Sequence, residues 1–384
     1  MIIVRLIEKK DNPILNGHPW IFSGSIDTVT GSSEEGHLCR VLNSKGHFVC
    51  QGMYNPLSNI SVRVLSLEKT PVTREFLQAR IQRAINLRKK IIPETTNCFR
   101  LINAEGDHLP GLIVDIYDNV LVMQFLCPGM EDFKNELVHI FHSLYPQAII
   151  HERSDVKSRR AEGLFPQSGP LYGTLSSGDI PTTETGVSFV VNVLTGDRTG
   201  FYLDHRSNRC RLQSFTSGKD VLDLFCYTGA FSLYALKAQA RSVVSVDSSA
   251  PAQAILRKNI ELNSMKQASW KHVRDDTFSF LAQENSRYDV IVCDPPPFSK
   301  GHEEYTKINT LAIEHLKPGG FLFTFAQNTP QLSSADLLKA LNRASKASGR
   351  TAKIIEPLFQ SPDFAILPSH PQGTHLLGFI VYVD

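Results

Sequence analysis

The segment Asp223-Leu-Phe-Cys-Tyr-Thr-Gly-Ala-Phe231 constrains the fold of this chain more than any other. It follows the apolar pair Val221-Leu222, which predicts a short buried strand that runs into an acidic residue. A tight turn with a single glycine, Gly229, then opens a helix. The next predicted strand, residues 242–247, also ends in an acid, Asp247. This pattern is typical of a parallel α/β sheet, in which ligands bind beyond the carboxyl ends of the strands.

The same residues indicate the kind of cofactor. An acid at the end of the second strand, here Asp247, is suited to ribose hydroxyls. The turn has one glycine where G-x-G-x-x-G has three, so a pyrophosphate cradle, and with it a nicotinamide oxidoreductase, is disfavoured. An adenosine without phosphates fits better, which points to S-adenosylmethionine. The residues expected to bind it are Tyr202, Asp204, Asp223, Phe225, Tyr227, Thr228, Gly229, Asp247, Ser248, Asp275 and Asp276.

A plainer interpretation of the acids remains open. Aspartate often caps the helix that follows it, and any one of these acids could do only that. Acids after three consecutive strands, at Asp223, at Asp247 and at Asp275-Asp276, favour a cofactor site over three separate caps.

Composition limits the remaining classes. A chain of 384 residues is expected to form two or three domains, and a net charge of +2 argues against a protein that coats polyanions. No apolar run approaches the ~20 residues that cross a bilayer, and the first residues lack the pattern of a signal peptide. The seven cysteines form no C-x-x-C pair, so neither a disulfide framework nor a metal site is predicted. A cytoplasmic protein without membrane contact is expected.

The chain is expected to be α/β, with three parts. Short β-type runs in residues 1–70 suggest a small barrel, and 73–91 reads as a helix rich in basic residues. Strands are expected within 99–127, and 153–180 reads as a loop-rich exit. From about 187 onward strands alternate with helices, as in parallel β-α units, and the last two strands are expected to form an antiparallel hairpin. The predicted domains are 1–70, 71–185 and 186–384.

In the third domain, seven strands that end in such a hairpin resemble the Rossmann-like sheet of class I methyltransferases. Strands are expected at 221–225, 242–247, 270–274, 289–293, 321–326, 353–359 and 376–383, and helices at 228–237, 250–263, 277–284, 303–315 and 333–347.

The loop Asp294-Pro-Pro-Pro-Phe-Ser299 follows the fourth of these strands. Proline fixes φ and has no N–H, so Pro295 and Pro296 stiffen a loop that starts at a strand-end carboxylate. A plain proline-rich strand exit would have the same composition. Next to the cofactor turn, we interpret Asp294, Pro295 and Pro296 as positioning a target base, together with Gln327 after the fifth strand.

Several motifs together resemble a known family. They are Leu15–Gly24, Glu152–Val156, Thr199–Arg206, Asp223–Phe231, Val246–Ser248, Arg274–Asp276 and Asp294-Pro-Pro. In this order they are similar to the bacterial large-subunit ribosomal RNA methyltransferases that combine an N-terminal PUA domain, a middle β-rich domain and a C-terminal methyltransferase domain. The resemblance runs nearly end to end.

This resemblance implies ribosomal RNA or a ribosomal precursor particle as the partner, and a homodimer is compatible with the sequence. The basic residues expected to contact RNA are Arg83, Arg88, Lys89, Arg153, Arg159 and Arg206. Phosphate contacts would give affinity with little sequence readout. Such a run of charges also fits a merely solvated face.

One position departs from the family pattern. Members that make 5-methylcytosine carry a nucleophilic cysteine after the fifth strand, where this chain has Phe325-Ala-Gln-Asn328 with Gln327 at the cysteine position. Without that thiolate, covalent activation of cytosine C5 is not expected, whereas guanine N7 or an exocyclic amine needs none. Two alternatives stay open: a catalytically silent RNA-binding relative that keeps the cofactor pocket, and a small-molecule methyltransferase.

Overall fold

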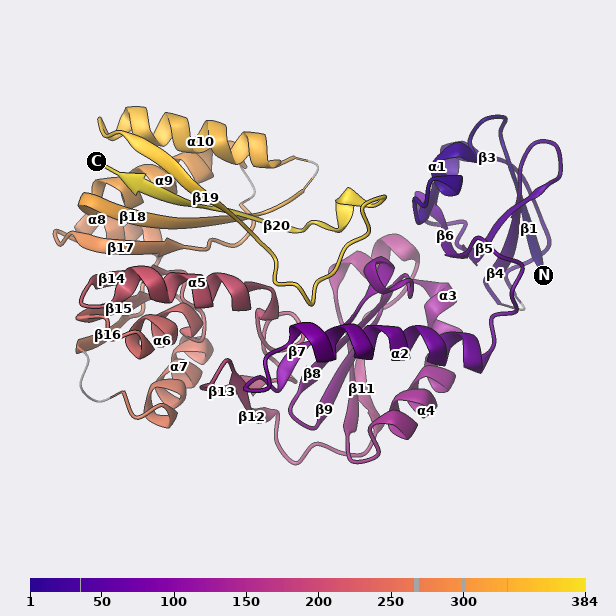
Figure 1. Ribbon diagram of the computed structural model, residues 1–384, viewed down its shortest axis with the longest axis horizontal. Helices are drawn as coiled ribbons and strands as arrows, with labels where there is room; N and C mark the ends of the chain where they lie inside the picture. Colours follow the sequence, from indigo (N-terminus) through magenta and orange to yellow (C-terminus); the bar gives the residue numbers. More distant parts are fainter. Residues whose placement is uncertain (35, 266–268, 299–300, 330) are drawn as a thin grey trace. The chain divides into compact units, whose positions relative to one another are not determined.

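The computed structural model describes residues 1–34, 36–265, 269–298, 301–329 and 331–384, and Figure 1 shows their elements. The chain divides into two compact units. The first comprises residues 1–180, 191–201 and 363–373, and the second comprises 181–190, 202–362 and 374–384. Residues 191–201 and 363–373, which the sequence prediction assigned to the third domain, therefore belong to the first unit. The three domain boundaries themselves remain a prediction.

The first unit begins with a six-stranded sheet in the order β2-β6-β5-β4-β1-β3. Its core consists of alternate side chains from these strands, such as Val4, Val41 and Val62, all fully buried. Only the β1–β4 pair is parallel among the pairs described. The elements are β1 (Ile2–Leu6), α1 (Asn12–Leu15), β2 (Trp20–Phe22), β3 (Ile26–Thr30), β4 (Leu38–Leu42), β5 (Phe48–Tyr54) and β6 (Ile60–Ser66).

A second sheet in this unit has the order β11-β10-β9-β8-β7. It packs with α2 (Arg74–Ile91), which begins where Thr73 accepts a hydrogen bond from the Phe76 backbone and buries Leu77, Ile81 and Ile85. The predicted helix over 73–91 is therefore confirmed. The other elements are β7 (Cys98–Asn103), β8 (Leu112–Tyr117), β9 (Val120–Phe125), α3 (Pro128–Glu131), α4 (Lys134–Leu144), β10 (Ile149–Ser154) and β11 (Gln167–Tyr172).

The expectation of a loop over 153–180 is wrong in part. Strand β11 lies inside it and pairs antiparallel with β10. Its side chains are mostly exposed, so the segment lacks the apolar alternation by which strands are found in a sequence. Strands β12 (Asp179–Glu184) and β13 (Val187–Asn192) then form a two-stranded sheet.

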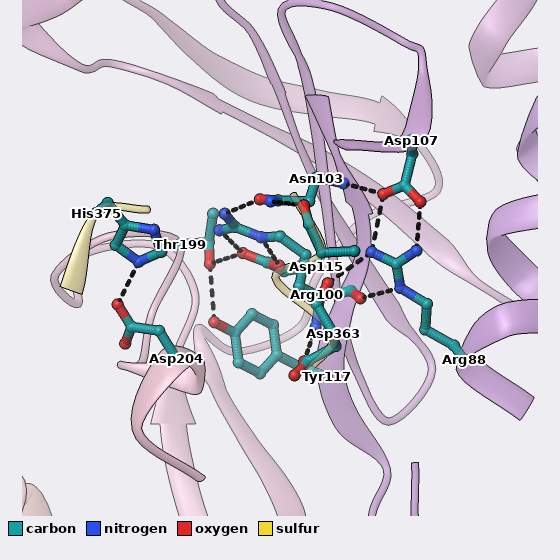
Figure 2. Close-up of polar contacts among 11 residues, drawn as sticks. Arg88, Arg100, Asn103, Asp107, Asp115, Tyr117, Thr199, Asp204, Asp363 and His375 are labelled. Carbon is teal, nitrogen blue, oxygen red and sulfur yellow. Dashed lines mark hydrogen bonds and ion pairs between the residues drawn. The ribbon is translucent and has the colours of Figure 1, made fainter. Parts of the chain in front are cut away.

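Buried polar contacts attach the two later segments to the first unit (Figure 2). The Thr199 hydroxyl donates to Asp115 Oδ2 at 2.6 Å and lies 2.8 Å from the Tyr117 hydroxyl. Asp363 accepts from the Arg100 backbone N–H at 2.9 Å through its carboxylate and from Arg88 at 2.6 Å through its carbonyl. These bonds satisfy polar groups that would otherwise be buried without partners.

The second unit is built on a seven-stranded sheet in the order β16-β15-β14-β17-β18-β20-β19, in which β20 is antiparallel to both neighbours. The predicted seven-stranded sheet and its terminal antiparallel hairpin are confirmed. The strands are β14 (Asp220–Leu224), β15 (Ser242–Val246), β16 (Ser269–Val273), β17 (Tyr288–Cys293), β18 (Leu316–Gln327), β19 (Ala352–Phe359) and β20 (Leu376–Val383).

Helices cover both faces of this sheet, with α8, α9 and α10 on one face and α5, α6 and α7 on the other (Figure 1). Because successive strand residues point to opposite faces, Leu222 packs in the core under α8–α10 and Val221 in the core under α5 and α6. The helices are α5 (Arg206–Thr216), α6 (Ala230–Lys237), α7 (Ala250–Leu262), α8 (Thr277–Gln283), α9 (His302–Glu314) and α10 (Ser334–Ala347). In the described parts of the chain, no helix has the length and apolarity that a membrane crossing requires.

Candidate active site

The turn between β14 and α6 has a conformation that few sequences allow. Phe225 and Tyr227 have positive φ values of 60° and 47°, and Gly229 has φ 78°. A Cβ on Gly229 would lie 1.9 Å from Leu256 Cδ1 of α7, so a side chain fits there only if the buried Leu256 side chain moves. The turn therefore brings the backbone close to α7.

Asp223 lies under this turn and is almost completely buried. Its Oδ2 accepts from the Ser232 backbone N–H at 3.0 Å and from the Ser232 hydroxyl at 2.6 Å. Burial, reinforced by the charges of Asp294 and Asp247 and opposed by Ser232, raises the pKa of Asp223 to about 7. The carboxyl group thus braces the first turn of α6 from the preceding strand.

Asp247 is placed differently. Its Oδ2 accepts from the Tyr227 backbone N–H and its Oδ1 from the Ser249 backbone N–H, both at 2.8 Å. Helix α7 is capped by Ser249, whose side chain accepts from Ala252. Each carboxylate oxygen can accept a further hydrogen bond, so Asp247 retains the capacity to receive ribose hydroxyls. Ser248, beside it, is exposed.

The two acids after β16 have unequal environments. Asp276 is the N-cap of α8 and accepts from the Ser279 backbone N–H at 3.0 Å, so the plainer interpretation applies to it. Asp275 accepts only the backbone N–H of Asp276, at 2.8 Å, among the contacts of the described residues. Asp275 is therefore the acid of this pair that better suits a ligand.

Thr228 provides an independent indication that a polar ligand fits the turn. Its hydroxyl is buried and has no hydrogen-bond partner among the residues that the structure describes. Buried hydroxyl groups normally have one. The ring of Tyr227 meets that of Tyr202 edge to face at 5.4 Å between centroids, which adds an aromatic wall. These residues fit an adenosine-type cofactor.

Asp204, which was predicted to bind the cofactor, contacts His375 in the structure. Its Oδ2 lies 2.9 Å from His375 Nε2 (Figure 2), and its carbonyl accepts from Ser361. The carboxylate is almost fully buried. Asp204 therefore fastens the start of α5 to the segment before β20, a role that its position after an aromatic pair did not predict.

The loop after β17 lies next to the cofactor turn. The rings of Phe298 and Phe225 are 6.3 Å apart, and Phe298 also packs on Tyr305 at 5.0 Å. At the other end of the loop, His205 Nε2 lies 3.1 Å from Asp294 Oδ2. Pro295 is buried and Pro296 exposed; Ser299 lies outside the described residues. Asp294 and Phe298 of this loop are thus both held by contacts within the second unit.

Gln327 is the last residue of β18 and is half-buried. Its neighbour Asn328 is fully engaged with the segment before β20, since its side chain donates to Thr374 at 2.7 Å and its backbone to His375 at 2.8 Å. The role of Gln327 in positioning a base stays a prediction.

The structure corrects most of the predicted RNA contacts. Arg88 is fully buried, and its guanidinium donates to both carboxylate oxygens of Asp107, at 2.5 and 2.8 Å (Figure 2). Arg153 and Arg159 are also buried, with carboxylate or carbonyl partners, and Arg206 is 3% exposed. A guanidinium buried among protein groups cannot contact a phosphate without losing those partners. The burial of these four arginines therefore argues against the predicted RNA contacts.

Arg83 and Lys89 remain exposed on α2. Arg83 lines a cavity of about 450 Å³ in the first unit, together with Arg80, Phe76, His18 and His108. Arg80 stacks on Phe76 at 4.1 Å and donates to the carbonyls of His108 and Leu65. Burial, and after it the charge of Arg83, lowers the pKa of Arg80 to about 10, and the cavity lining also includes Glu68.

The described residues contain no group of three or more histidine, cysteine, aspartate or glutamate side chains that could hold a metal ion. Sequence reasoning gave no role to His205, although it lies in the quoted segment Thr199–Arg206. Of its two partners, Asn208 lies three residues away and Asp294 lies far away in the sequence. No sequence motif identifies either contact.

Comparison with known proteins agrees with this geometry. Residues 4–67 match a PUA-like domain family, and residues 172–372 match the S-adenosylmethionine-dependent methyltransferase family. A protein named "Ribosomal RNA large subunit methyltransferase I" from Pseudoalteromonas translucida is 37% identical and covers 97% of both chains. One of the same name from Shewanella frigidimarina is also 37% identical, over 100% of this chain and 99% of its own.

Two solved structures share the complete fold. One, provisionally assigned as an S-adenosylmethionine-dependent methyltransferase from Streptococcus mutans, has a TM-score of 0.86 and 22% identity over 100% of both chains. Another, a protein complexed with S-adenosylhomocysteine, has the same TM-score and coverage with 21% identity. The expected fold and cofactor are thereby confirmed. The chain belongs to the S-adenosylmethionine-dependent methyltransferases, within the group that carries an N-terminal PUA-like domain.

Proposed function

We propose that this enzyme methylates a base of large-subunit ribosomal RNA. The full-length relatives are named for that substrate. The observation that carries the proposal is the contact between Phe225 of the cofactor turn and Phe298 of the proline loop, 6.3 Å between centroids. It joins a cofactor site to a rigid loop that presents the Asp294 carboxylate.

In this proposal the residues around the turn have separate roles. Asp247 receives the ribose hydroxyls, Asp275 the adenine amino group, and Thr228 supplies its unpartnered hydroxyl. The rings of Tyr202 and Tyr227 flank the adenosine. S-adenosylmethionine supplies a methyl group activated by its sulfonium, and the chain contributes position and exclusion of water. Asp223 and Gly229 act on the shape of the turn.

We propose further that no cysteine adduct forms during the reaction. Cys293 is fully buried in β17 and Cys226 is almost so, and burial raises the pKa of each thiol well above its usual value. A thiol held neutral is a poor nucleophile. Asp294 and Gln327 flank the place where the base must enter, and neither can add to a ring carbon.

The chemistry that suits such a site uses a lone pair of the base itself. At guanine N7 the in-plane lone pair forms the new bond to the methyl carbon while the carbon–sulfur bond breaks, and no proton needs to leave. At an exocyclic amine one proton must leave, and the Asp294 carboxylate is placed to accept it. In both cases the base must be turned out of its stack.

RNA contact is proposed for Arg83 and Lys89 of α2 and for the cavity beside Arg80. A cation without a carboxylate partner near a cavity attracts phosphate, and this attraction weakens as salt rises. A ribosomal precursor particle as the natural substrate and a homodimeric assembly are retained as proposals; transfer assays on particles and sedimentation of the purified protein test them.

The function is tested by methyl transfer. Purified protein, tritiated S-adenosylmethionine and deproteinised ribosomal RNA from cells lacking the gene should give labelled large-subunit RNA, while RNA from the parent cells should accept little label. An Asp294→Ala variant that binds cofactor normally is the matched control. Cofactor binding without transfer to either RNA would instead support the silent relative.

The absence of an adduct is tested separately. Incubation with 5-fluorocytosine-containing RNA and S-adenosylmethionine should yield no complex that survives denaturation. A stable covalent complex would show that a cysteine does add to the base and would overturn this part of the proposal.

A further inference from the structure

His205 contacts α6, β18 and the residue that follows β17 in the second unit. It lies just before α5, and its ring meets Phe231 of α6 at 5.3 Å and Phe325 of β18 at 4.6 Å, both edge to face. Its Nε2 lies 3.1 Å from Asp294, which follows β17. The side chain is 2% exposed, so its orientation is fixed by packing.

The contact of the other ring nitrogen, Nδ1, indicates which of the two nitrogens carries the proton. Nδ1 lies 3.2 Å from Asn208 Nδ2, and the same Asn208 amide nitrogen donates to the Phe359 carbonyl at 3.1 Å. An amide nitrogen only donates, so Nδ1 must accept. Turning the amide over would place its oxygen against the Phe359 carbonyl oxygen, which disfavours that alternative. The ring is then neutral, with its proton on Nε2.

The first turn of α5, which carries Asn208, is held by Ser361. The Ser207 backbone N–H donates to the Ser361 hydroxyl at 3.0 Å, and that hydroxyl donates to the Asp204 carbonyl at 2.9 Å. The first turn of α5 is thus attached to the end of β19 on both sides of His205.

We propose that His205 is a positioning residue for methyl transfer: as its neutral tautomer it directs the Nε2–H at Asp294 Oδ2 and so fixes the carboxylate for the target base. One oxygen is then occupied by the histidine. The Asp294 side chain is 24% exposed, and in this proposal its other oxygen, Oδ1, faces the target base. The inference rests on the proposed function, since the base is its substrate.

Two measurements test it. The first is ¹⁵N spectroscopy of the full-length free protein with labelled histidine, where a His205→Gln sample identifies the resonances. We expect a pyrrole-like Nε2 that carries the proton and a pyridine-like Nδ1. A proton on Nδ1, or on both nitrogens, overturns the proposal. This measurement needs no RNA, so it remains decisive even if the wild-type protein transfers no methyl group and the proposed function fails.

The second is kinetics of three variants at saturating S-adenosylmethionine. Gln can place an amide donor near the Nε2 position, whereas Phe keeps the ring without a donor and Asn reaches only the Nδ1 position. Loss of a hydrogen bond to a charged group should lower kcat about 10- to 100-fold in His205→Phe and His205→Asn, with KM for RNA changed much less. His205→Gln should recover most of kcat.

His315→Gln serves as the matched control, because His315 is part-buried in the same unit but bonds to the Leu311 and Glu284 carbonyls before β18 begins. It should leave kcat unchanged. Equal loss in His205→Gln and His205→Phe, or an unchanged kcat in His205→Phe, would overturn the positioning role. S-adenosylhomocysteine affinity, measured by calorimetry, should be the same in all of these variants.

Discussion

The backbone N–H of Tyr227 donates to Asp247 Oδ2 at 2.8 Å and thereby joins the turn after β14 to the acid after β15. The bond orients the carboxylate along the carboxyl edge of the sheet. Asp247 therefore contributes to the shape of the turn, and in the proposed function it also accepts hydrogen bonds from the ribose, which is the basis of the first prediction.

Replacing Asp247 by Asn should weaken S-adenosylhomocysteine binding by about 10- to 100-fold, because a charge-assisted acceptor is lost while the volume is preserved. Calorimetry on the purified variant measures the affinity directly. Glu261→Gln, the same change at an exposed acid near the end of α7, is the control and should bind almost as well. Unchanged affinity in Asp247→Asn would exclude Asp247 from the cofactor site.

Replacing Asp275 and replacing Asp276, the two acids after β16, should affect different properties: cofactor affinity in the first case and stability in the second. Asp276→Ala removes the N-cap of α8 and should cost about 0.5–2 kcal/mol in the free energy of unfolding with little change in cofactor affinity. Asp275→Ala should weaken cofactor affinity and leave stability nearly unchanged. Denaturant titration and calorimetry on both variants give the comparison, and a reversed pattern would contradict the assignment.

Gly229 and Gly218 form a matched pair for the turn. Both have positive φ, 78° and 68°, but a Cβ on Gly218 meets nothing within 4 Å, whereas one on Gly229 would lie 1.9 Å from Leu256. Gly218→Ala should cost about 1–2 kcal/mol, the cost of the left-handed backbone alone. Gly229→Ala should cost several kcal/mol more and abolish cofactor binding. Similar losses in the two variants would show that the close approach to Leu256 is unimportant.

Asp223 should make the folded state more stable at lower pH. Its raised pKa of about 7 means that the folded state keeps a proton which the unfolded chain releases near pH 4. Folding therefore takes up a proton between about pH 4 and 7, and this contribution to stability is lost as pH rises through that window. In Asp223→Asn the free energy of unfolding should fall less over the same window. A steeper fall in the variant would contradict the buried, protonated state.

Substitutions of Arg83 and Arg88 should have different effects, on RNA binding and on stability respectively, although both residues lie in helix α2. Arg83→Glu should raise KM for RNA and reduce the salt dependence of binding by about one ion, because an exposed phosphate contact is lost. Arg88→Ala should cost about 3–5 kcal/mol in stability, since Asp107 is left buried without its partner. RNA binding at several salt concentrations and denaturant titration distinguish them; an Arg83→Glu variant that binds RNA normally would remove α2 from the RNA surface.

The sequence predicts the second unit well because each strand is a short apolar run that ends in a turn or an acid. Val221 and Leu222 identify β14 because both are apolar, although they point to opposite faces of the sheet. The predicted strands begin and end within a few residues of the observed ones, except that β18 already starts at Leu316. Exposed strand β11 and helix α5, which is rich in arginine, carry no such apolar signal. Strand β11 forms because it pairs with β10, the strand before it in the chain, and α5 forms because it packs on the sheet beside α6.

Side-chain roles were harder to predict for the same reason. Arginine is normally exposed, so the clusters around Arg88 and Arg159 suggested a phosphate-binding surface. The carboxylates that bury them, Asp107 and Glu131, are distant in sequence. His205 is a second example, because the residue it contacts, Asp294, lies far from it in the sequence and no local pattern links the two.

Mass spectrometry of large-subunit ribosomal RNA nucleosides tests the central claim most directly. The deletion strain should lack one methylated base that the parent contains, and the wild-type gene should restore it while the Asp294→Ala variant should not. The missing nucleoside should be 7-methylguanine or an amino-methylated base. An unchanged nucleoside profile in the deletion strain would contradict the proposed function, and a missing 5-methylcytosine would contradict the chemistry proposed for Gln327 and the buried cysteines.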